Sequence, residues 1–333
     1  MIRLAIDAMG GDNAPIEMIQ GVNLAIKKYD DIEIHLFGDE NIIREYLVET
    51  PRVKVYHAPE YLDMGVEDPI KALRQNPNYS MFQAIKHVKE GNADAVVTAG
   101  PTQGAVVGGT LILRRLKGMK RVAIAPFIPD FEGRTRILLD SGANVEFRAE
   151  HLLDFAVVAS IISKSYFKVD NPVVGLVNIG AEPGKGRVED IEAYELLNNN
   201  PSINFYGNVE PKELLSTDVD VIVTDGFTGN ILMKSYEGAV KAFSNALKKE
   251  IYSSTRAKLG GLLLKKAFKN IKSNANPDVV GGAIIIGVDG ILVKAHGSSN
   301  AFAFSNGIRL GRELAKEDIM SKIRIAVEEL HNE

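Results

Sequence analysis

A chain of 333 residues that is 45% hydrophobic and 25% charged is long enough to bury a large core and too apolar to be disordered. It has no cysteine, which excludes disulfides, thiol nucleophiles and thiolate metal sites, and its net charge of -4 argues against general nucleic-acid binding. No basic leader precedes the first apolar run, and no uncharged apolar run reaches about 18 residues. We therefore expect a soluble, cytoplasmic protein.

Short apolar runs alternate with amphipathic stretches along most of the chain. The runs that predict strands are 2–7, 32–37, 53–57, 94–98, 122–126, 136–140, 173–178, 203–206, 219–224 and 291–295. The stretches that predict helices are 15–28, 40–48, 78–90, 103–117, 150–167, 187–199, 229–250, 257–272 and 300–330. This alternation predicts a doubly wound α/β fold, with a mostly parallel sheet covered by helices on both faces. Because no linker is visible, we expect 1–333 to form a single large domain.

The region 240–275 breaks this rhythm because helix follows helix with no strand between, so we expect it to project from the sheet. Between positions 241 and 272 nine Lys or Arg residues accompany a single acid, Glu250. Drawn as one helix, 258–272 carries leucines and a phenylalanine on one half and lysines on the other. This pattern is typical of binding to an anionic membrane or an acidic partner, but also of a helix packed in a core or a dimer interface. The residues expected to make that contact are Leu259, Leu263, Leu264, Lys265, Lys266 and Phe268.

Glycine-rich and polar segments follow seven of the predicted strands. They are 7–13, 98–104, 140–144, 178–186, 207–211, 224–230 and 294–299. Because ligands bind at the carboxyl ends of the strands in an open parallel sheet, we expect these loops to meet at one edge and to line one crevice. The alternative for any single loop is an ordinary tight turn, which Gly, Asn and Asp also suit.

The chemistry of these loops favours an anion such as phosphate. Adjacent glycines, as at Gly10 and Gly11, let backbone N–H groups approach a ligand, and the N-termini of the following helices add positive charge. Lys185, Lys294 and His296 are candidate cations. There is neither a GxxxxGK[ST] motif nor a GxGxxG motif after the first strand, so the predicted ligand is phosphate or a phosphorylated compound rather than specifically a nucleotide.

Neither a covalent nucleophile nor a metal site is indicated. The sequence has no GxSxG and no HExxH, and its six histidines are scattered. Asp7, Asp12, Asp140 and Asp225 could bind Mg²⁺ if they converged, but aspartates at such positions more often cap helices. We therefore expect no metal and no cofactor.

Six motifs spread over the chain resemble those of one family, the bacterial phosphate acyltransferases of phospholipid synthesis. They are DAMGGDNAP (7–15), DSGAN (140–144), GLVNIGAEPGKG (175–186), YGNVE (206–210), VTDGFTGN (223–230) and KAHGSS (294–299). One segment departs from the family pattern, since TAGPTQGA (98–105) has Pro101 and Gln103 where the family has Asn and Gly. Position 101 therefore lacks a side-chain amide, while Gly100 and Thr102 remain.

The resemblance implies that inorganic phosphate attacks the thioester of an acyl-acyl carrier protein (acyl-ACP) to give an acyl phosphate, with no covalent enzyme intermediate and no cofactor. It also implies a Rossmann-like αβα sandwich similar to isocitrate and isopropylmalate dehydrogenases. The protein would be a homodimer, peripherally associated with the inner face of the cell membrane. Its implied partners are acyl-ACP, an anionic membrane surface and a downstream membrane glycerol-3-phosphate acyltransferase, with no nucleic acid among them.

The chemistry of the loops and the resemblance together suggest roles for individual residues. The expected catalytic residues are Lys185, His296, Asp225 and Asn230. The residues expected to bind phosphate or substrate are Asp7, Gly10, Gly11, Asp12, Asn13, Gly100, Thr102, Asp140, Asn144, Asn178, Asn208, Gly226, Thr228, Gly229, Lys234, Gly297 and Ser298.

The sequence leaves three alternative functions open. A phosphate acetyltransferase or an NAD(P)-dependent decarboxylating dehydrogenase would suit a similar fold, but the dehydrogenase needs an arginine cluster at the strand ends, and Arg114, Arg115 and Arg121 do not lie there. A non-catalytic scaffold could recruit the carrier protein or membrane enzymes through the basic helices. The glycine-rich loops argue against a scaffold, because it needs no anion site.

Overall fold

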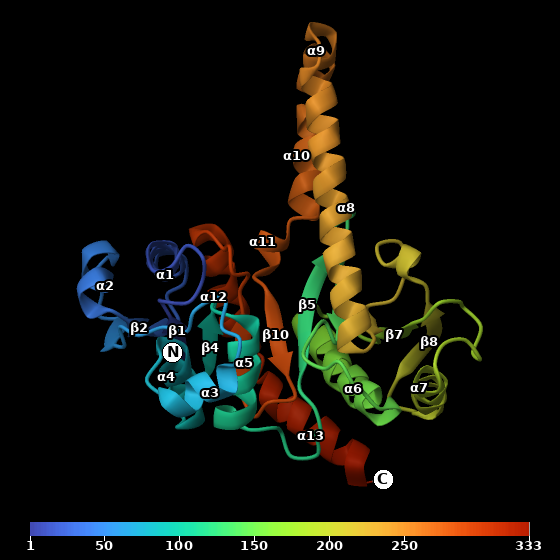
Figure 1. Ribbon diagram of the computed structural model, residues 1–333, viewed down its shortest axis with the longest axis horizontal. Helices are drawn as coiled ribbons and strands as arrows, with labels where there is room; N and C mark the ends of the chain where they lie inside the picture. Colours follow the sequence, from blue (N-terminus) through green and yellow to red (C-terminus); the bar gives the residue numbers. More distant parts are fainter. Residues whose placement is uncertain (333) are drawn as a thin grey trace.

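The computed structural model describes residues 1–332 and joins eleven strands in one sheet (Figure 1). The strands are β1 (Ile2–Asp7), β2 (Ile32–Gly38), β3 (Val53–His57), β4 (Ala95–Thr98), β5 (Ala123–Pro129), β6 (Thr135–Leu139), β7 (Val173–Val177), β8 (Asn204–Val209), β9 (Val221–Val223), β10 (Ala283–Ile286) and β11 (Ile291–Lys294). Their order across the sheet is β3-β2-β1-β4-β11-β10-β5-β6-β9-β7-β8. The sequence did not predict β10, because a four-residue apolar run does not by itself distinguish a strand from a helix.

Neighbouring strands are parallel except in the middle of the sheet. The antiparallel pairs are β11–β10, β10–β5 and β5–β6, so the sheet is mostly parallel, as predicted. Because these three antiparallel pairs follow one another, the strands on either side of them run in opposite directions. Strands β1, β2, β3, β4 and β11 run in one direction, and β6, β7, β8 and β9 run in the opposite one.

Helices cover both faces of the sheet, which confirms the doubly wound α/β fold. They are α1 (Ile16–Lys28), α2 (Glu40–Tyr46), α3 (Pro69–Gln75), α4 (Ser80–Lys89), α5 (Thr102–Gly108), α6 (Ala149–Tyr166), α7 (Val188–Asn199), α8 (Gly226–Tyr252), α9 (Thr255–Leu263), α10 (Lys265–Asn274), α11 (Pro277–Val280), α12 (Ala301–Lys316) and α13 (Ile319–Asn332). The predicted helix 103–117 is α5 continued by one π-helical turn, and 300–330 is two helices separated by Asp318, which has a φ of 48°.

Side-chain alternation along the strands separates one large apolar core from two smaller ones. In β1, Leu4 and Ile6 join the core under α1, α6, α7, α12 and α13, while Ala5 joins the core under α4 and α5. In the other half of the sheet, Leu138 and Ile222 pack with the first turns of α8 instead. The two smaller cores therefore lie on one side of the sheet, which we name the α4/α8 face.

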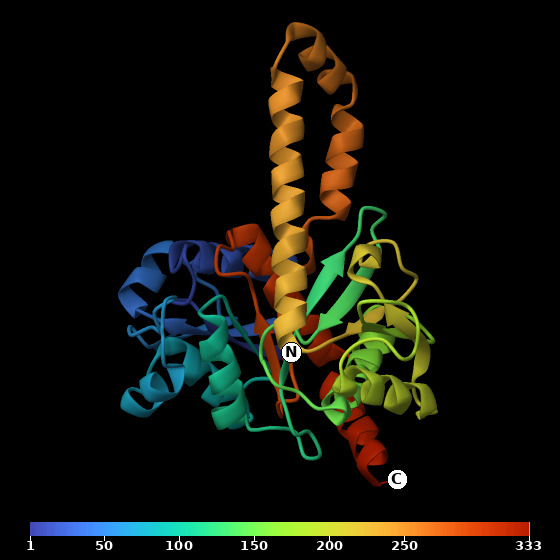
Figure 2. The same ribbon diagram turned by 45° about the vertical axis from the view of Figure 1, so that its right-hand side comes forward.

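Helices α8, α9 and α10 form an arm that projects away from the sheet (Figures 1 and 2). The prediction of one helix over 257–272 is wrong, because the chain turns at Leu264 between α9 and α10 and then returns toward the sheet. Gly261 allows α9 to approach the end of α8, since a Cβ there would lie 2.6 Å from Cγ2 of Ile251. Within residues 1–332, no helix is both long and apolar enough to cross a bilayer.

Candidate functional site

The polar loops form two groups rather than the single crevice expected from the sequence. The first loop cluster consists of the loops that follow β1, β4 and β11 (8–15, 99–102 and 295–299). The second loop cluster consists of the loops that follow β6, β7 and β9 (140–147, 178–187 and 224–230). Because these two sets of strands run in opposite directions, their carboxyl ends lie at opposite edges of the sheet. The expectation of one edge is wrong, because the strand reversals arise from long-range pairing.

Both clusters nevertheless open on the α4/α8 face. Asp7 follows Ile6 and so lies on the same side of the sheet as Ala5, and Asp140 lies on the side of Leu138. Strands β10 and β5 stand between β11 and β6, so the strands that lead into the two clusters lie about 14 Å apart across the sheet, and the length of the strands adds to the separation of the clusters. A phosphate ion is too small to touch both, whereas a long substrate could extend from one to the other.

Asp7 organises the first loop cluster. Its carboxylate is fully buried and accepts hydrogen bonds from Ser80 Oγ (2.7 Å), Thr98 Oγ1 (2.7 Å) and the backbone N–H of Met9 (3.1 Å). Burial raises the pKa of Asp7, although these donors act in the opposite direction. Asp7 therefore ties β1 to β4 and α4 and has few lone pairs left for a ligand.

The glycines of the first loop cluster allow its loops to touch. A Cβ on Gly10 would lie 2.4 Å from Oδ2 of Asp7 and 2.8 Å from Cα of Gly100, and Gly11 has a φ of +122°. No other residue fits either position without strain. The backbones of the β1 and β4 loops are thereby brought into direct contact.

Asn13 joins the β1 loop to the β11 loop. Its Nδ2 donates to the carbonyl oxygens of Ser298 (3.1 Å) and Ser299 (3.2 Å), and the N–H of Asp12 donates to Gly297 O (2.8 Å). The exposed ring of His296 lies on the same loop, with Nδ1 2.8 Å from Oγ of Ser298. Exposed Thr102 begins α5 nearby. The fold therefore brings together all the candidates from 7–13, 98–104 and 294–299.

Lys294 is the one candidate cation that is buried. Only 6% of its surface is exposed, and Nζ donates to the carbonyl oxygens of Ala99 (3.2 Å) and Ala295. Among the described residues no carboxylate oxygen lies within 4.0 Å of this nitrogen. Burial lowers the pKa of Lys294 to about 8, while the charges of Asp12 and Asp7 act to raise it.

Asp140 organises the second loop cluster in the same manner. It is buried and accepts from the backbone N–H groups of Ile124 (3.0 Å), Ala143 (3.0 Å) and Asn144 (2.8 Å), as well as from Nδ2 of Asn144 (2.8 Å). Burial raises the pKa of Asp140 despite these bonds. Both Asp140 and Asn144 are thus used to fold the loop 140–144.

Asp225 occupies the start of α8. Its Oδ1 accepts from the N–H groups of Phe227 (3.0 Å) and Thr228 (2.9 Å), and Oδ2 accepts from Thr228 Oγ1 (2.6 Å) and Arg187 Nη2 (2.6 Å). Although burial opposes it, the bonds from Thr228 and Arg187 hold the pKa of Asp225 below its ordinary value. The helix N–H groups that the sequence suggested for phosphate are therefore already bound within the protein.

The glycines of α8 serve close packing. A Cβ on Gly229 would lie 2.0 Å from Asp140 O, and one on Gly226 would lie 2.3 Å from Asn144 O. Asn230 lies beside the same loop, since its Nδ2 would be 2.6 Å from a Cβ on Gly142. The first turn of α8 is thus pressed against the loop 140–144.

Two asparagines shape the loop that carries Lys185. Asn178 Nδ2 donates to Lys185 O (2.9 Å) and to Oδ1 of Asn208 (3.2 Å), and Asn208 Nδ2 donates to Glu182 O (2.8 Å). The side chains of Lys185 and of Lys234, on α8, are exposed. Lys185 and His296 therefore belong to different clusters.

Arg187 and a set of exposed apolar side chains were not recognised in the sequence. Arg187 is held by Asp190 (2.9 Å) and Asp225 and lies over the ring of Phe147, 4.8 Å from its centre. The spacing of Arg187 and Asp190 by three residues was the available signal. The exposed apolar residues of the second loop cluster and the start of α8 are Val145, Ile179, Phe227 and Ile231. Isolated apolar residues in loops carry no periodicity, so their exposure in one loop cluster could not be predicted from the sequence.

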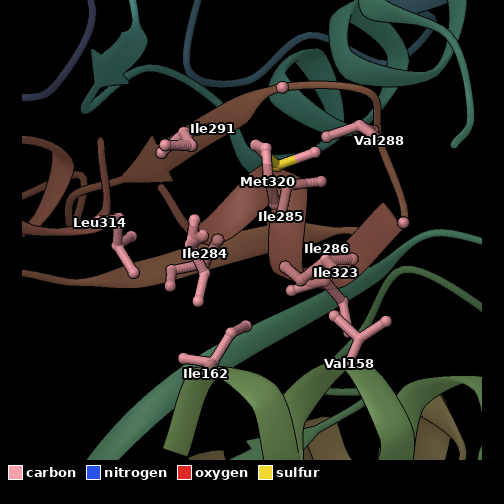
Figure 3. Close-up of a pocket in the computed structure, with 13 residues that line it drawn as sticks. Val158, Ile162, Ile284, Ile285, Ile286, Val288, Ile291, Leu314, Met320 and Ile323 are labelled. Carbon is pink, nitrogen blue, oxygen red and sulfur yellow. The ribbon is translucent and has the colours of Figure 1, made fainter. Parts of the chain in front are cut away.

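A small apolar cavity lies mainly in the large core, between β10, β11, α6 and α13 (Figure 3). It has a volume of ≈ 20 Å³ and is lined by residues such as Val158, Ile162, Ile286 and Ile323. That is enough for about one water molecule, and no polar side chain lines it. The cavity is a small packing gap rather than a substrate site. No cluster of metal-binding side chains occurs among residues 1–332.

Comparison with known proteins decides the family. Residues 2–322 match the family described as fatty acid synthesis protein. The chain is 50% identical over 326 residues to a phosphate acyltransferase of Acholeplasma laidlawii, covering 97% of this chain and 98% of the relative. This chain belongs to the phosphate acyltransferase family. It is 40% identical over 329 residues to the phosphate acyltransferase of Staphylococcus aureus strain Newman, with 99% of each chain covered.

Solved structures at lower identity share the fold of this acyltransferase. The EutD phosphotransacetylase from Staphylococcus aureus is 15% identical, with a TM-score of 0.59 and 94% of each chain covered. The 4-hydroxythreonine-4-phosphate dehydrogenase from Klebsiella pneumoniae is 12% identical, with a TM-score of 0.55 and coverage of 95% of this chain and 100% of that chain. At these identities the similarity concerns the fold alone.

Proposed function

We propose that this acyltransferase moves a fatty acyl group from acyl-ACP to inorganic phosphate and releases an acyl phosphate for phospholipid synthesis. The observation that carries the proposal is membership of the phosphate acyltransferase family over nearly the whole chain. The close glycine loops of the first loop cluster support it, because backbone N–H groups and a cation suit an anionic nucleophile.

In the proposed reaction, phosphate itself is the nucleophile. One of its oxygens forms a bond to the thioester carbonyl carbon, the tetrahedral intermediate collapses, and the C–S bond breaks with its electron pair on sulfur. The protein's task is to hold phosphate in line with the carbonyl and to stabilise the oxyanion. No covalent intermediate with the enzyme forms. We assign phosphate to the first loop cluster, since the N-terminus of α8 in the second is occupied by Asp225. Exposed His296 is the proposed donor to the oxyanion or to the leaving sulfur.

The second loop cluster is proposed to receive the acyl donor. Its exposed apolar residues, Ile179 and Phe227 among them, would contact the acyl chain or the donor arm. Lys185 would face the carbonyl oxygen or the acidic carrier, and Arg187 would act there in the orientation that Asp225 gives it. Asp225 is thus proposed to position Arg187. A donor extended over β5 and β10 would bring the thioester toward the phosphate.

The arm is proposed to bind an anionic membrane surface or the carrier protein. Leu263 near its tip is 86% exposed, and Leu259 and Leu264 are exposed with it beside Lys265 and Lys266. We further propose a homodimer, peripheral association with the inner face of the cell membrane, and a membrane glycerol-3-phosphate acyltransferase as the consumer of the product. Leu263→Glu should leave the midpoint of thermal unfolding unchanged and reduce flotation with anionic liposomes. Equal flotation of variant and wild type would remove the membrane role of the tip.

A direct assay separates this function from the alternatives. The full chain is incubated with long-chain acyl-ACP and phosphate, with a chelator and without nicotinamide, and both carrier thiol release and hydroxylamine-trapped acyl phosphate are measured. We expect both signals to require phosphate and to disappear when sulfate replaces it. In a separate incubation with a hydroxy acid and NAD(P), reduction of the nicotinamide would instead indicate a dehydrogenase. No thiol release in the first assay and no reduction in the second would indicate a scaffold. If Lys185→Ala and His296→Ala both kept the wild-type rate, their assigned roles would be wrong.

A further inference from the structure

We propose that Lys294 is the residue that binds inorganic phosphate in the first loop cluster, through an ammonium group that the fold buries with no carboxylate partner among residues 1–332. The proposal rests on the function proposed above and names the group that recognises its nucleophile. The sequence and the resemblance favoured Lys185 over Lys294 as the cation, but the side chain of Lys185 is exposed and lies in the other cluster.

Lys294 is buried although its side chain ends in an ammonium group. Removing an ammonium from water is unfavourable unless a counter-charge replaces the lost solvation, and a buried lysine is normally paired for this reason. Lys294 is 6% exposed and makes its hydrogen bonds to two backbone carbonyls, Ala99 O and Ala295 O. The dipoles of two carbonyl groups offset only part of the free energy lost when the ammonium leaves water. An anion that enters the loop cluster would supply the missing negative charge.

The nearby carboxylates do not fill this role. Asp7 is committed to Ser80, Thr98 and the N–H of Met9, and neither Asp7 nor Asp12 brings an oxygen within 4.0 Å of Lys294 Nζ. An ammonium close to carboxylates but not bonded to them is still available to a ligand. The lowered pKa of Lys294, about 8, is what such an unpaired buried amine should have.

The ammonium of Lys294 also lies beside the glycine loop that follows β1. Lys294 ends β11, directly opposite Thr98 at the end of β4. The carbonyl of Ala99, which accepts from Nζ, lies 3.6 Å from the place a Cβ on Gly11 would occupy. The ammonium is therefore next to the glycine loop, where main-chain N–H groups can be approached closely. A positive charge beside glycine backbone is the combination that suits a phosphate oxygen.

The test measures phosphate binding directly, without the acyl donor. The affinity of the full chain for inorganic phosphate is determined by isothermal titration in phosphate-free buffer, for wild type, Lys294→Met, Lys294→Arg and the exposed control Lys164→Met. The phosphate KM and the acyl-ACP KM are measured in parallel. Lys294→Met keeps the volume of the side chain and removes the charge, so its unfolding midpoint should equal or exceed that of wild type.

We expect Lys294→Met to weaken phosphate binding by about 10- to 100-fold and to raise the phosphate KM with little change in the acyl-ACP KM. Lys294→Arg should keep more of the affinity than Lys294→Met, and Lys164→Met should match wild type. Equal phosphate affinity of Lys294→Met and wild type would overturn the proposal, as would equal losses in the Met and Arg variants. A wild-type chain that binds phosphate but transfers no acyl group would instead contradict the proposed function and leave the assignment of Lys294 standing.

Discussion

The two loop clusters use the same kinds of residue for different ends. In the second loop cluster, Asp140 and Asp225 are satisfied by N–H groups of their own loops and by Arg187, so its polar atoms are mostly engaged in folding. In the first, Asp7 is satisfied in the same way, but no carboxylate of the part of the chain that the structure describes is bonded to Lys294 beside it. A buried charged group that is bonded to no opposite charge is therefore a better indicator of a ligand site than one that already has its partners.

The largest loss of stability should come from disturbing the packing of α8 against the loop 140–144. Gly229→Ala would place a Cβ 2.0 Å from Asp140 O, a backbone atom that cannot move without disrupting the second loop cluster. We expect a loss of about 3 kcal/mol or more in the free energy of unfolding, measured by urea denaturation. Gly238→Ala in the same helix is the matched control, because nothing lies within 4 Å of its Cβ. The control should gain about 0.5–1 kcal/mol, and equal effects of the two changes would contradict a packing role for Gly229.

The next largest effect should be on the pH dependence of stability, through Lys294 in the first loop cluster. The pKa of Lys294 in the folded chain, about 8, lies below its ordinary value of 10.5. Between these values the unfolded chain holds the proton and the folded chain does not, so the stability of the wild type should rise with pH across this window. The rise attributable to Lys294 is at most about 3 kcal/mol. The Lys294→Met variant should not show this rise in stability. Urea denaturation at pH values below and above the range between the two pKa values measures the rise in each protein. Asp7 and Asp12, which face the Lys294 ammonium, are present in both proteins and so do not account for a difference between them. If the stability of wild type and of Lys294→Met changed with pH in the same way, Lys294 would not be an unpaired buried charge.

A smaller effect should follow from Asp225→Asn in the second loop cluster. Asparagine keeps an acceptor for the N–H groups of Phe227 and Thr228 but loses the charge that holds Arg187. We expect a loss of about 1–2 kcal/mol of stability and a higher KM for acyl-ACP, with the phosphate KM unchanged. Arg187→Gln should act alike, and the double variant should lose less than the sum of the single losses. Additive losses would show that Asp225 and Arg187 do not act as a pair.

The smallest effect is expected at the junction of the β1 and β11 loops. Asn13→Ala removes two hydrogen bonds from an exposed side chain to Ser298 O and Ser299 O. The free energy of unfolding should fall by less than about 1 kcal/mol, while the phosphate KM should rise several-fold because the loop is less well fixed. A higher acyl-ACP KM with an unchanged phosphate KM would reverse the assignment of ligands to the two clusters.

Much of this architecture follows from local patterns in the sequence. Most strands and helices were predicted near their observed positions, because apolar runs and helical periodicity are properties of neighbouring residues. The six motifs were enough to indicate the family. The arm was expected to project, but the break at Leu264 was missed, since a helical wheel assumes that the helix continues.

Local sequence is enough to show which residues occur at the ends of strands, and hence which chemistry is available. How these residues are grouped depends on the fold, because the direction of each half of the sheet is set by β10, β5 and β6 pairing across long stretches of chain. The tertiary structure also decided which groups remain unpaired. Asp225 and Lys294 both looked like candidate site residues, yet three-dimensional packing gives the first its partners, whereas no carboxylate oxygen of the described residues lies within 4.0 Å of the second's ammonium. Hydrogen-bond satisfaction depends on neighbours in space, and for Lys294 no property of the adjacent sequence reveals it.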